Sequence, residues 1–338
     1  MRVIFLSAWD TGLMQQPPFI LGLKGLSRFE GACVATIGSF DGVHRGHQQI
    51  LRRVVERAQR DNIASVVIVF EPQPHEFFAR TATRPRLMRL REKVNALLAA
   101  GVTTVVCLRF NHGFRSLTAD AFIEQVLVQG LHVKHLEIGD DFRFGCDRRG
   151  DFEHLVSAGA RHGFSVANSA TFAHAGERVS STRIRSLLEQ NQLAAAERLL
   201  GKPYSIYGRV IYGRQLGRTI DVPTANIGLG RYAAAVSGVY AVRVNVHAQQ
   251  ARSNAAGQQE YQGVANVGIK PTIAGEHKPV LEVHIFDFNG DLYGQCVTVS
   301  FCQALRAEKR FDSLDALKAQ IASDISNARQ YFSHLAKH

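Results

Sequence analysis

The first half of the chain alternates short apolar segments with longer amphipathic ones. The apolar segments are rich in β-branched residues, as strands are, and lie at 33–40, 65–72, 103–110, 133–142 and 164–170. The segments between them carry apolar residues at helical spacing and lie at 44–60, 89–101, 118–130 and 151–162. Strands that are apolar on both faces and are separated by helices predict a parallel sheet covered on both sides.

From about residue 204 the pattern changes to alternating strands joined by turns. These strands are predicted at 205–213, 238–246, 261–269, 280–288 and 295–302. Together they predict an antiparallel barrel or sandwich. A final amphipathic helix places five apolar residues on one face, which should pack on this sheet: Leu314, Leu317, Ile321, Ile325 and Ala328.

The length of 338 residues allows two domains of these different architectures. We predict an α/β chain in which a Rossmann-like domain with a parallel sheet precedes an antiparallel β-barrel domain with a C-terminal helix. The first domain is predicted at 31–187, a helical connector at 188–203 and the second domain at 204–338. The sequence assigns no role to residues 1–30.

Composition narrows the classes of function. The net charge of +11 indicates an anionic partner, which could be nucleic acid, a membrane surface or a phosphorylated small molecule. The five cysteines are scattered and are never spaced as CxxC, which argues against a disulfide framework or a zinc site. Asp10, Pro17 and Pro18 interrupt the N-terminal apolar run, and no segment approaches a membrane span, so we expect a cytoplasmic location.

The loop after the first predicted strand, GSFDGVHRGH, is a candidate ligand site, because parallel sheets bind ligands beyond the carboxyl ends of their strands. Its turn consists of Gly38, Ser39, Phe40, Asp41 and Gly42. His44 and His47 follow on one face of the first helical turn, where amide groups and the helix dipole favour phosphate. Their imidazoles could donate hydrogen bonds to a triphosphate. A surface or capping role, or half of a metal site, are the alternatives.

This stretch resembles the HxGH motif of the nucleotidyltransferase superfamily, in the form found in bacterial FAD synthetases. The segment IGDDFRFG is similar to a family segment that contacts adenosine or flavin, which implies that role for Asp141. The segment VSSTRIR resembles the family's second phosphate motif, although by itself it indicates only an N-capped helix. The resemblance implies phosphate-binding hydroxyls and a triphosphate-binding arginine at Ser180, Ser181, Thr182 and Arg185.

In the second half, GRVIYGRQLGRTIDVPTAN could form a backbone nest for phosphates or simply a hairpin loop. Its candidate phosphate-binding glycines are Gly208, Gly213 and Gly217. The oxygens of Thr224 and Asn226 are hard ligands that suit Mg²⁺. The stretch resembles the riboflavin kinase domain, whose PTAN motif holds nucleotide-bound magnesium. It departs from that family at Asp221 and Val222, where Gly-Phe is usual.

The strand LEVHIFDF places Leu281, Val283 and Ile285 on one face and Glu282 and His284 on the other. An acidic residue at such a position could simply face solvent. The resemblance to riboflavin kinases instead implies that Glu282 is the catalytic base. It also implies that SGVYAV lies in a flavin-binding loop, with Gly238 and Tyr240 as the flavin-binding residues.

The order of these motifs is that of bifunctional bacterial riboflavin kinase and FAD synthetase. The resemblance implies two reactions, phosphorylation of riboflavin by ATP to FMN and adenylylation of FMN by ATP to FAD and pyrophosphate, with Mg²⁺ as cofactor. The first reaction needs a base for an alcohol, whereas the attacking phosphate oxygen of FMN is already anionic. Riboflavin, FMN, FAD and ATP are the expected partners, with no nucleic acid, membrane or obligate protein partner.

Two other classes of protein remain as alternatives. One is an HxGH transferase for another phosphate acceptor, such as a pantetheine or nicotinamide derivative, against which the kinase-like second half argues. The other is a basic nucleic-acid-binding protein. That function would need basic residues interleaved with exposed aromatic ones on a sheet face, and the sequence shows no such stripe.

Overall fold

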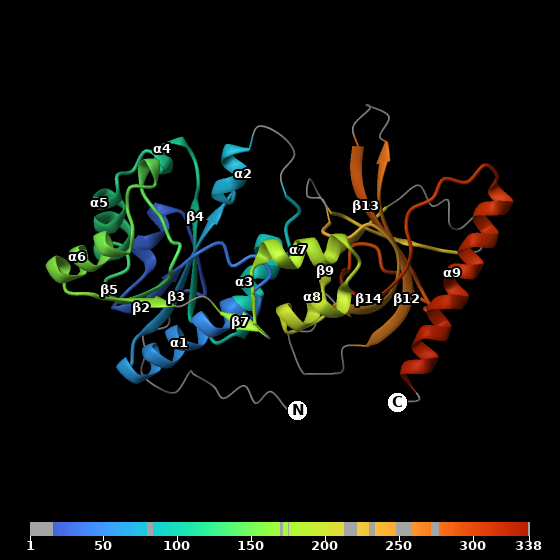
Figure 1. The fold of residues 1–338 in the computed structure, drawn as a ribbon, viewed down its shortest axis with the longest axis horizontal. Helices are drawn as coiled ribbons and strands as arrows, with labels where there is room; N and C mark the ends of the chain where they lie inside the picture. Colours follow the sequence, from blue (N-terminus) through green and yellow to red (C-terminus); the bar gives the residue numbers. More distant parts are fainter. Residues whose placement is uncertain are drawn as a thin grey trace. The chain divides into compact units, whose positions relative to one another are not determined.

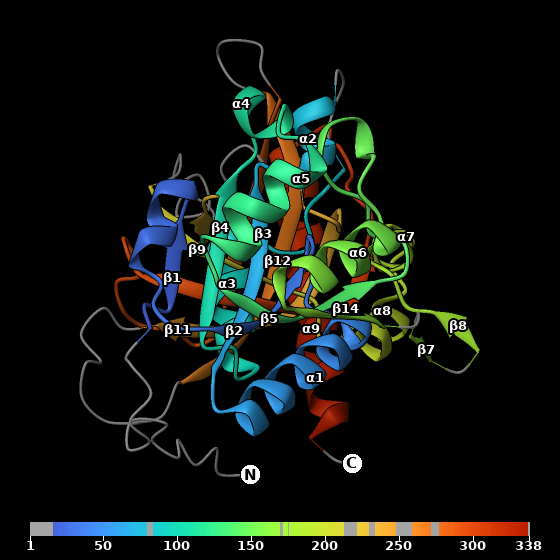
Figure 2. The same cartoon turned by 90° about the vertical axis from the view of Figure 1, so that its left-hand side faces the viewer.

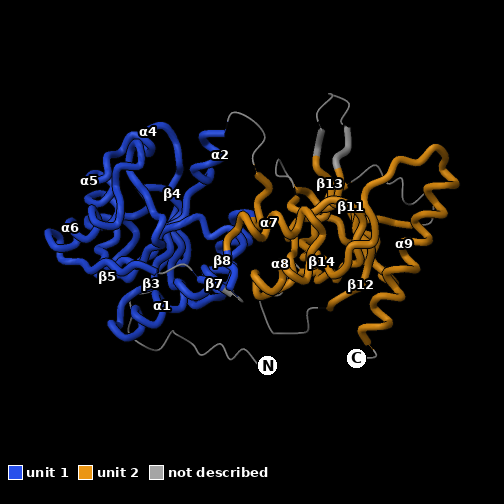
Figure 3. The backbone as a smooth tube through the Cα atoms, viewed as in Figure 1, with its two compact units in different colours: residues 1–83, 89–179 blue, residues 84–88, 180–338 orange. Residues whose placement is uncertain are grey.

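The computed structural model describes residues 16–79, 84–169, 172–174, 176–212, 222–229, 234–247, 259–271 and 277–336. The chain divides into two compact units (Figure 3), unit 1 with residues 1–83 and 89–179 and unit 2 with residues 84–88 and 180–338. Unit 1 contains the sheet and unit 2 the barrel (Figure 1). The boundaries predicted at 187 and 203 stay a prediction.

Unit 1 is built on a six-stranded parallel sheet in the order β1-β4-β3-β2-β5-β6. Its strands are β1 Phe19–Leu21, β2 Cys33–Ile37, β3 Ala64–Glu71, β4 Thr104–Arg109, β5 Val133–Gly139 and β6 Ser165–Ser169. The predicted parallel sheet is confirmed, with β1 as an additional edge strand. The order reverses at β2, so the loops after β2 and β5 flank the crevice where such sheets bind ligands.

Helices cover both faces of this sheet. Helix α1 (Arg45–Asp61) packs Val54 and Ala58 against Val34 of β2. Ala35 and Ile37 point to the opposite face and join a larger apolar cluster with α5, η2 and α6. The remaining elements of unit 1 are η1 Leu23–Arg28, α2 Pro74–Phe78, α3 Leu90–Ala99, α4 His112–Arg115, α5 Ala119–Phe122, η2 Ile123–Val128, η3 Cys146–Arg148, α6 Phe152–His162, β7 Ala173–His174 and β8 Glu177–Arg178.

Unit 2 contains a closed antiparallel barrel in the order β10-β13-β12-β11-β14-β9. Its elements are α7 Ser181–Glu189, α8 Leu193–Leu200, β9 Ser205–Ile211, β10 Ala225–Ile227, β11 Gly238–His247, β12 Glu260–Pro271, β13 His277–Ile285, β14 Cys296–Arg306 and α9 Leu314–Leu335. The predicted barrel is confirmed. Strand β10, which lies within the PTAN motif, is too short to show an alternating pattern in the sequence.

Helix α9 packs on the outside of the barrel, with Ala328 and Phe332 against Ala241 and Phe286. Leu314 is 57% exposed, so its predicted place on the packed face is wrong. It is the first residue of the helix, and the buried stripe begins only later along α9. None of the helices in the described part of the chain has the length and apolar character needed to cross a membrane.

Candidate active sites

The loop between β2 and α1 has an unusual backbone. Phe40, Gly42 and Val43 all have positive φ angles, of 46°, 88° and 43°. That conformation is rare for residues other than glycine, and especially for a β-branched one such as Val43. Strained residues of this kind cluster at ligand sites, where surrounding structure holds them. Successive turns of this type also direct backbone amides toward one place, which suits an anion.

The structure brings the two histidines of this loop together. His44 is the N-cap of α1, and its Nδ1 accepts a hydrogen bond of 3.3 Å from the amide of His47. The two rings stack with centroids 3.6 Å apart and planes 15° from parallel. Since Nδ1 of His44 accepts, the proton of its neutral ring is on Nε2. The capping role considered from the sequence therefore exists, and it fixes the ring beside His47.

His47 is held in its neutral form. Burial lowers its pKa well below the ordinary value, and repulsion by His44 and Lys93 lowers it further. The ring packs against Phe40, with centroids 4.9 Å apart. Its Nδ1 is buried and has no hydrogen-bond partner within the described residues. A neutral imidazole with an unsatisfied nitrogen can form one hydrogen bond with a bound ligand, as donor or as acceptor.

A buried polar network attaches α1 to the sheet. Glu137 of β5 accepts hydrogen bonds from Arg53 of α1, at 3.2 Å, and from Ser169 of β6. His135 lies at 3.4 Å from its other oxygen. Burial alone would raise the pKa of Glu137, but the hydrogen bonds from His135, Ser169 and Arg53 outweigh it and lower the pKa to about 2. This network joins the helix that begins at the histidine loop to two neighbouring strands.

We expect Glu137→Gln to lower the free energy of unfolding of unit 1 by about 1–3 kcal/mol at neutral pH, because buried donors lose a charged acceptor. The folded pKa of Glu137 lies below its usual 4.5, so the stabilisation is present above pH 4.5 and is lost as pH falls toward 2. Wild type and variant should therefore converge in acid. Hydrogen exchange of unit 1 peptides across urea measures this, with the exposed Glu56→Gln as control. Equal stability at neutral pH would contradict the argument.

A cluster of phenylalanines lies at the carboxyl end of the same sheet. Neighbouring rings have centroids 5.3–6.1 Å apart. The members of this phenylalanine cluster are Phe70, Phe77, Phe78, Phe110, Phe114, Phe122, Phe142 and Phe144. They come from β3, α2, α4, α5 and the loops after β4 and β5; Figure 2 shows α2 and α4 at one end of the strands. Phe78 is 53% exposed, so the cluster reaches the surface.

Sequence reasoning missed this phenylalanine cluster. Its signal is present in the 20 phenylalanines of the chain, several of which fall in the segments HEFF, RFNHGF and DFRFG that follow predicted strands. Asp141, predicted to contact adenosine or flavin, lies in the same loop as Phe142. Its carboxylate is exposed and forms an ion pair of 3.3 Å with Arg178. The structure therefore places Asp141 next to aromatic side chains, and its role stays a prediction.

The second phosphate motif begins α7, which belongs to unit 2. Ser180 is the N-cap and accepts a hydrogen bond of 3.2 Å from the amide of Arg183. Ser181 is half-buried and Thr182 is exposed. The Arg185 Nε donates a hydrogen bond of 2.6 Å to the carbonyl of Pro85. The N-capped helix predicted from the sequence is present, and the phosphate-binding roles stay a prediction.

In the barrel, Glu282 stands in a row of polar side chains. Its cross-strand partners are Asn226 on β10 and Asn266 on β12. Directly opposed residues of antiparallel strands have Cβ atoms about 4.5–5.5 Å apart. Leu281 and Val283 on either side are buried, so Glu282 points to the outer surface of the barrel. The structure thus joins the predicted base with a predicted metal ligand, and it adds Asn266, which was not predicted from the sequence.

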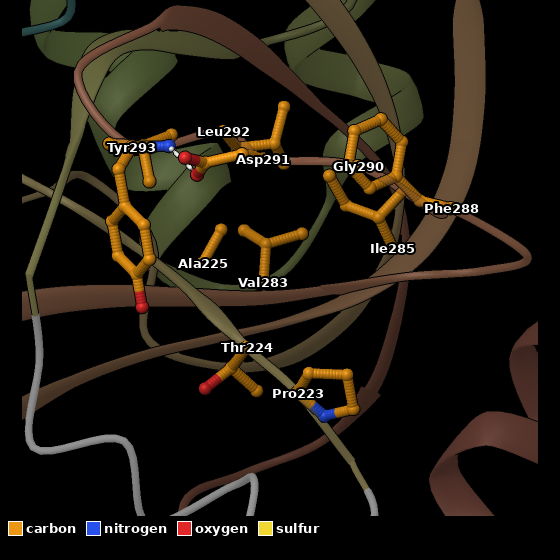
Figure 4. Close-up of a pocket in the computed structure, with 11 residues that line it drawn as sticks. Pro223, Thr224, Ala225, Val283, Ile285, Phe288, Gly290, Asp291, Leu292 and Tyr293 are labelled. Atoms are coloured by element: carbon orange, nitrogen blue, oxygen red, sulfur yellow. Dashed lines mark hydrogen bonds between the residues drawn. The ribbon is translucent and has the colours of Figure 1, made fainter.

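A pocket of about 130 Å³ (Figure 4) includes Ala225 and Val283, whose side chains alternate with Asn226 and Glu282 and so point to the other face of β10 and β13. It is lined by Val210, Pro223, Thr224, Ala225, Val283, Ile285, Phe288, Gly290, Asp291, Leu292 and Tyr293. The Asp291 carboxylate accepts a hydrogen bond of 2.8 Å from the amide of Tyr293, which orders the segment after β13. The ring of Tyr293 stacks on Tyr212, with centroids 4.1 Å apart. Apolar side chains line the pocket together with polar residues, among them Thr224 and Asp291.

The glycines that were predicted to bind phosphate or flavin lie in different surroundings. Gly208 is a buried position within β9, opposite Val297, and is engaged in sheet pairing. Gly213, Gly217 and Asp221 lie outside the described residues. Gly238 has a φ of 118°, and an added Cβ would stand 2.6 Å from the carbonyl oxygen of Arg306, so only glycine fits.

Tyr240 is completely buried inside the barrel. Its hydroxyl donates to the side chain of Asn191 and, at 2.7 Å, lies beside the carbonyl of Ser237. Burial raises the pKa of Tyr240 to about 12, so the hydroxyl stays protonated. The direct flavin contact predicted for Tyr240 stays a prediction. The structure shows a residue that anchors the turn before Gly238.

The comparisons with known proteins match both halves of the chain. The FAD synthetase family model matches residues 27–183, and the riboflavin kinase family model matches residues 200–332. A bifunctional riboflavin kinase/FMN adenylyltransferase of Pseudomonas fluorescens is 48% identical over 310 residues, which are 92% of this chain and 96% of that protein. The protein of the same name from Escherichia coli (strain K12) is 47% identical over 314 residues, covering 93% and 97%.

One solved structure is similar to most of this chain. It is a crystal structure named as a macrolide-efflux protein from Streptococcus pneumoniae, and it superposes with a TM-score of 0.74 at 30% identity, covering 91% of this chain and 97% of that one. The two family models and these relatives agree. The chain belongs to the family of bifunctional riboflavin kinase/FMN adenylyltransferases.

Proposed function

We propose that unit 2 phosphorylates riboflavin at the row of Asn226, Glu282 and Asn266, and that unit 1 adenylylates the resulting FMN at the loop of His44 and His47. The assignment of one reaction to each unit is supported by the different chemistry of the two sites. The barrel offers a carboxylate in a polar row on one face of β13 and a pocket that is lined from the other face of the same strand. The histidine loop offers the neutral imidazole of His47 and a strained backbone turn, and the anionic phosphate of FMN needs no base there.

In the kinase reaction, Glu282 accepts the proton of the riboflavin alcohol as its oxygen attacks the γ-phosphorus of ATP. The pocket suits the adenine of ATP, because its apolar side chains and the Tyr212–Tyr293 stack can enclose a planar base. Gly238 and the neighbouring end of β14 support binding of riboflavin, since they bring two backbone segments into close contact. Tyr240 acts there by anchoring the turn rather than by exposure to the ligand.

Thr224 and Asn226 fit a magnesium ion. Both supply neutral, hard oxygen atoms, and Asn226 stands directly opposite Glu282. Mg²⁺ usually takes one or two protein ligands and completes its shell with water and phosphate oxygens, so this pair is sufficient. The ion would neutralise charge on the transferred phosphoryl group. The side chains of this chain orient the nucleotide and remove the proton.

We expect Asn226→Ala to raise the Mg²⁺ concentration for half-maximal FMN formation by about tenfold or more, because a ligand is lost. Titration of Mg²⁺ at saturating riboflavin and ATP measures this. Asn245→Ala on β11 is the matched control, because Asn245 pairs with Glu260 and Thr298, away from the row. An unchanged Mg²⁺ dependence in a folded Asn226→Ala protein would remove Asn226 from the metal site.

In the adenylyl transfer, a phosphate oxygen of FMN attacks the α-phosphorus of ATP and pyrophosphate leaves. The nucleophile is already anionic, so the site must orient the reactants and stabilise charge. The loop from Gly38 to Gly42 and the imidazoles of His44 and His47 are placed to bind phosphates. For Ser180, Ser181, Thr182 and Arg185 at the start of α7 in unit 2, phosphate binding is implied by the resemblance alone. The phenylalanine cluster supplies aromatic surface for the isoalloxazine ring.

Incubation of the purified protein with riboflavin, ATP and Mg²⁺, followed by chromatography, tests the proposed function. FMN should appear first and FAD after it, and FMN with ATP should give FAD alone. Pantetheine phosphate and nicotinamide mononucleotide serve as competing acceptors, and neither should be adenylylated. A protein that forms FMN but adenylylates one of those acceptors instead of FMN would contradict the assignment of unit 1. Cytoplasmic location stays a prediction from the sequence.

A further inference from the structure

A buried carboxylate lies in the stripe of helix α9 that packs on the barrel. Asp324 is 3% exposed, and Ala328 and Phe332, which follow on the same face of the helix at intervals of four residues, are also buried. Aspartate is rarely buried unless it is paired, and a buried ion pair often stabilises a fold no better than apolar side chains of similar volume. Stability alone therefore does not account for an acidic residue here, and its partner shows what it holds in place.

The partner of Asp324 is Arg306, the last residue of β14. Nε of Arg306 donates hydrogen bonds of 3.0 and 3.1 Å to the two carboxylate oxygens, and Nη2 donates one of 2.8 Å. Gln320, one turn earlier in α9, donates another of 3.0 Å to Oδ1 of Asp324. Nη1 of Arg306 donates at 3.0 Å to the carbonyl of Ala307, just after the strand. A planar guanidinium held at several points keeps one orientation, so these contacts fix both the side chain and the backbone at the end of β14.

The backbone of Arg306 faces the first residue of β11. An added Cβ at Gly238 would stand 2.6 Å from the Arg306 carbonyl oxygen. Val239 pairs with Arg306 but Tyr240 pairs with Ala304, so the ladder between β11 and β14 is irregular at this point. A bulge of this kind interrupts the ladder, and bulges are common next to active sites. The strand pairing alone therefore holds this end of β14 weakly, and the ion pair with α9 supplies the missing constraint.

We propose that Asp324 is a positioning residue of the riboflavin site. Through Arg306 it holds the irregular end of β14 against Gly238, in the loop assigned above to flavin binding, and so sets the affinity for riboflavin without contacting it. This inference rests on the proposed function of unit 2. A displacement of the order of 1 Å at a substrate site has large effects, so a shift of this backbone should weaken riboflavin binding. Glu282 stands on β13, which does not pair with β14, so the chemical step should change less.

Asp324→Asn in the full chain tests the proposal, because an amide of the same size cannot form the two-point contact of a carboxylate with the guanidinium. The KM for riboflavin in FMN formation should rise by about tenfold or more, while kcat and the KM for ATP change by no more than about threefold. Arg306→Lys keeps the positive charge and the backbone carbonyl but loses the planar fork, so it should raise the riboflavin KM in the same way. FAD formation from FMN reports on unit 1 and should not change.

Arg329→Gln is the matched control on the same helix. It removes an exposed ion pair with Asp287, which follows β13, and should leave the riboflavin KM within about twofold of wild type. An equal rise in KM for Arg329→Gln would show a general effect of α9 and would overturn the proposal.

A variant that only loosens the fold lowers the amount of active protein, which reduces the apparent kcat and leaves the KM unchanged. An unchanged riboflavin KM in Asp324→Asn, with or without a lower kcat, would therefore overturn the proposal. If Asp324→Asn does not fold, Arg306→Lys answers the same question by the same criterion. A wild-type protein that forms no FMN would instead refute the proposed function of unit 2.

Discussion

Glu282→Gln is expected to reduce FMN formation from riboflavin by about 10²–10⁴-fold and to leave FAD formation from FMN unchanged. Glutamine keeps the size of the side chain but cannot accept the proton of the alcohol. The row formed with Asn226 and Asn266 should persist, because an amide can occupy the same place on β13. Adenylylation needs no base, since the phosphate of FMN is ionised before it attacks.

Separate assays with riboflavin and with FMN measure this effect. Glu260→Gln is the control, because it removes a carboxylate from the far end of β12, where Glu260 pairs with Asn245. It should retain both activities. Loss of both activities in a correctly folded Glu282→Gln protein would show that the two sites are not independent. Retention of FMN formation would exclude Glu282 as the base.

His47→Ala is expected to have the reverse effect, a fall of about 10²–10³-fold in FAD formation with unchanged FMN formation. Alanine removes the ring that donates to the phosphates and also the partner on which His44 stacks. Because burial, His44 and Lys93 hold the pKa of His47 well below its ordinary value, the wild-type ring stays neutral near pH 7. Its titration should therefore not appear in the rate between about pH 6 and 8.

The pH dependence of FAD formation in wild type and in His47→Ala tests this directly. His162→Ala at the end of α6 is the control, since its Nε2 meets only Glu124, at 3.9 Å, among the described ion pairs. It should retain both activities. A wild-type rate that falls with the titration of a group near pH 6.5, and loses that dependence in His47→Ala, would mean that the charged ring acts in catalysis.

Most of the fold could be predicted because its elements have strong periodic patterns. The four central strands of the parallel sheet, β2 to β5, are nearly continuous runs of buried residues, and α1 has a clear apolar stripe ending at Ala58. The missed strands have only two or three residues each, too few for a period to appear: β1, β7, β8 and β10. The helix predicted at 118–130 contains a π-helical part, which side-chain spacing does not reveal.

Site residues could be predicted from the sequence where one short motif contains all of them. His44 and His47 are three residues apart, and the helix start brings their rings together. The row of Asn226, Glu282 and Asn266 depends on the register of three strands, which local sequence does not determine. Lys93 shares the face of α3 on which Leu97 is buried, but lysine is usually an exposed residue, so its burial is not expected from the sequence.

The short strand β1 has a consequence for any shortened form of this protein. It pairs with β4, a strand with five consecutive buried residues that would otherwise form the outer edge of the sheet. An uncovered, regular, apolar edge is a template for joining another chain, and proteins generally protect such edges. The match to the FAD synthetase family model begins at residue 27, after β1. Residues that precede this match therefore protect the edge of β4 and reduce aggregation. Trimming the chain to that match would expose β4 and favour self-association through its backbone.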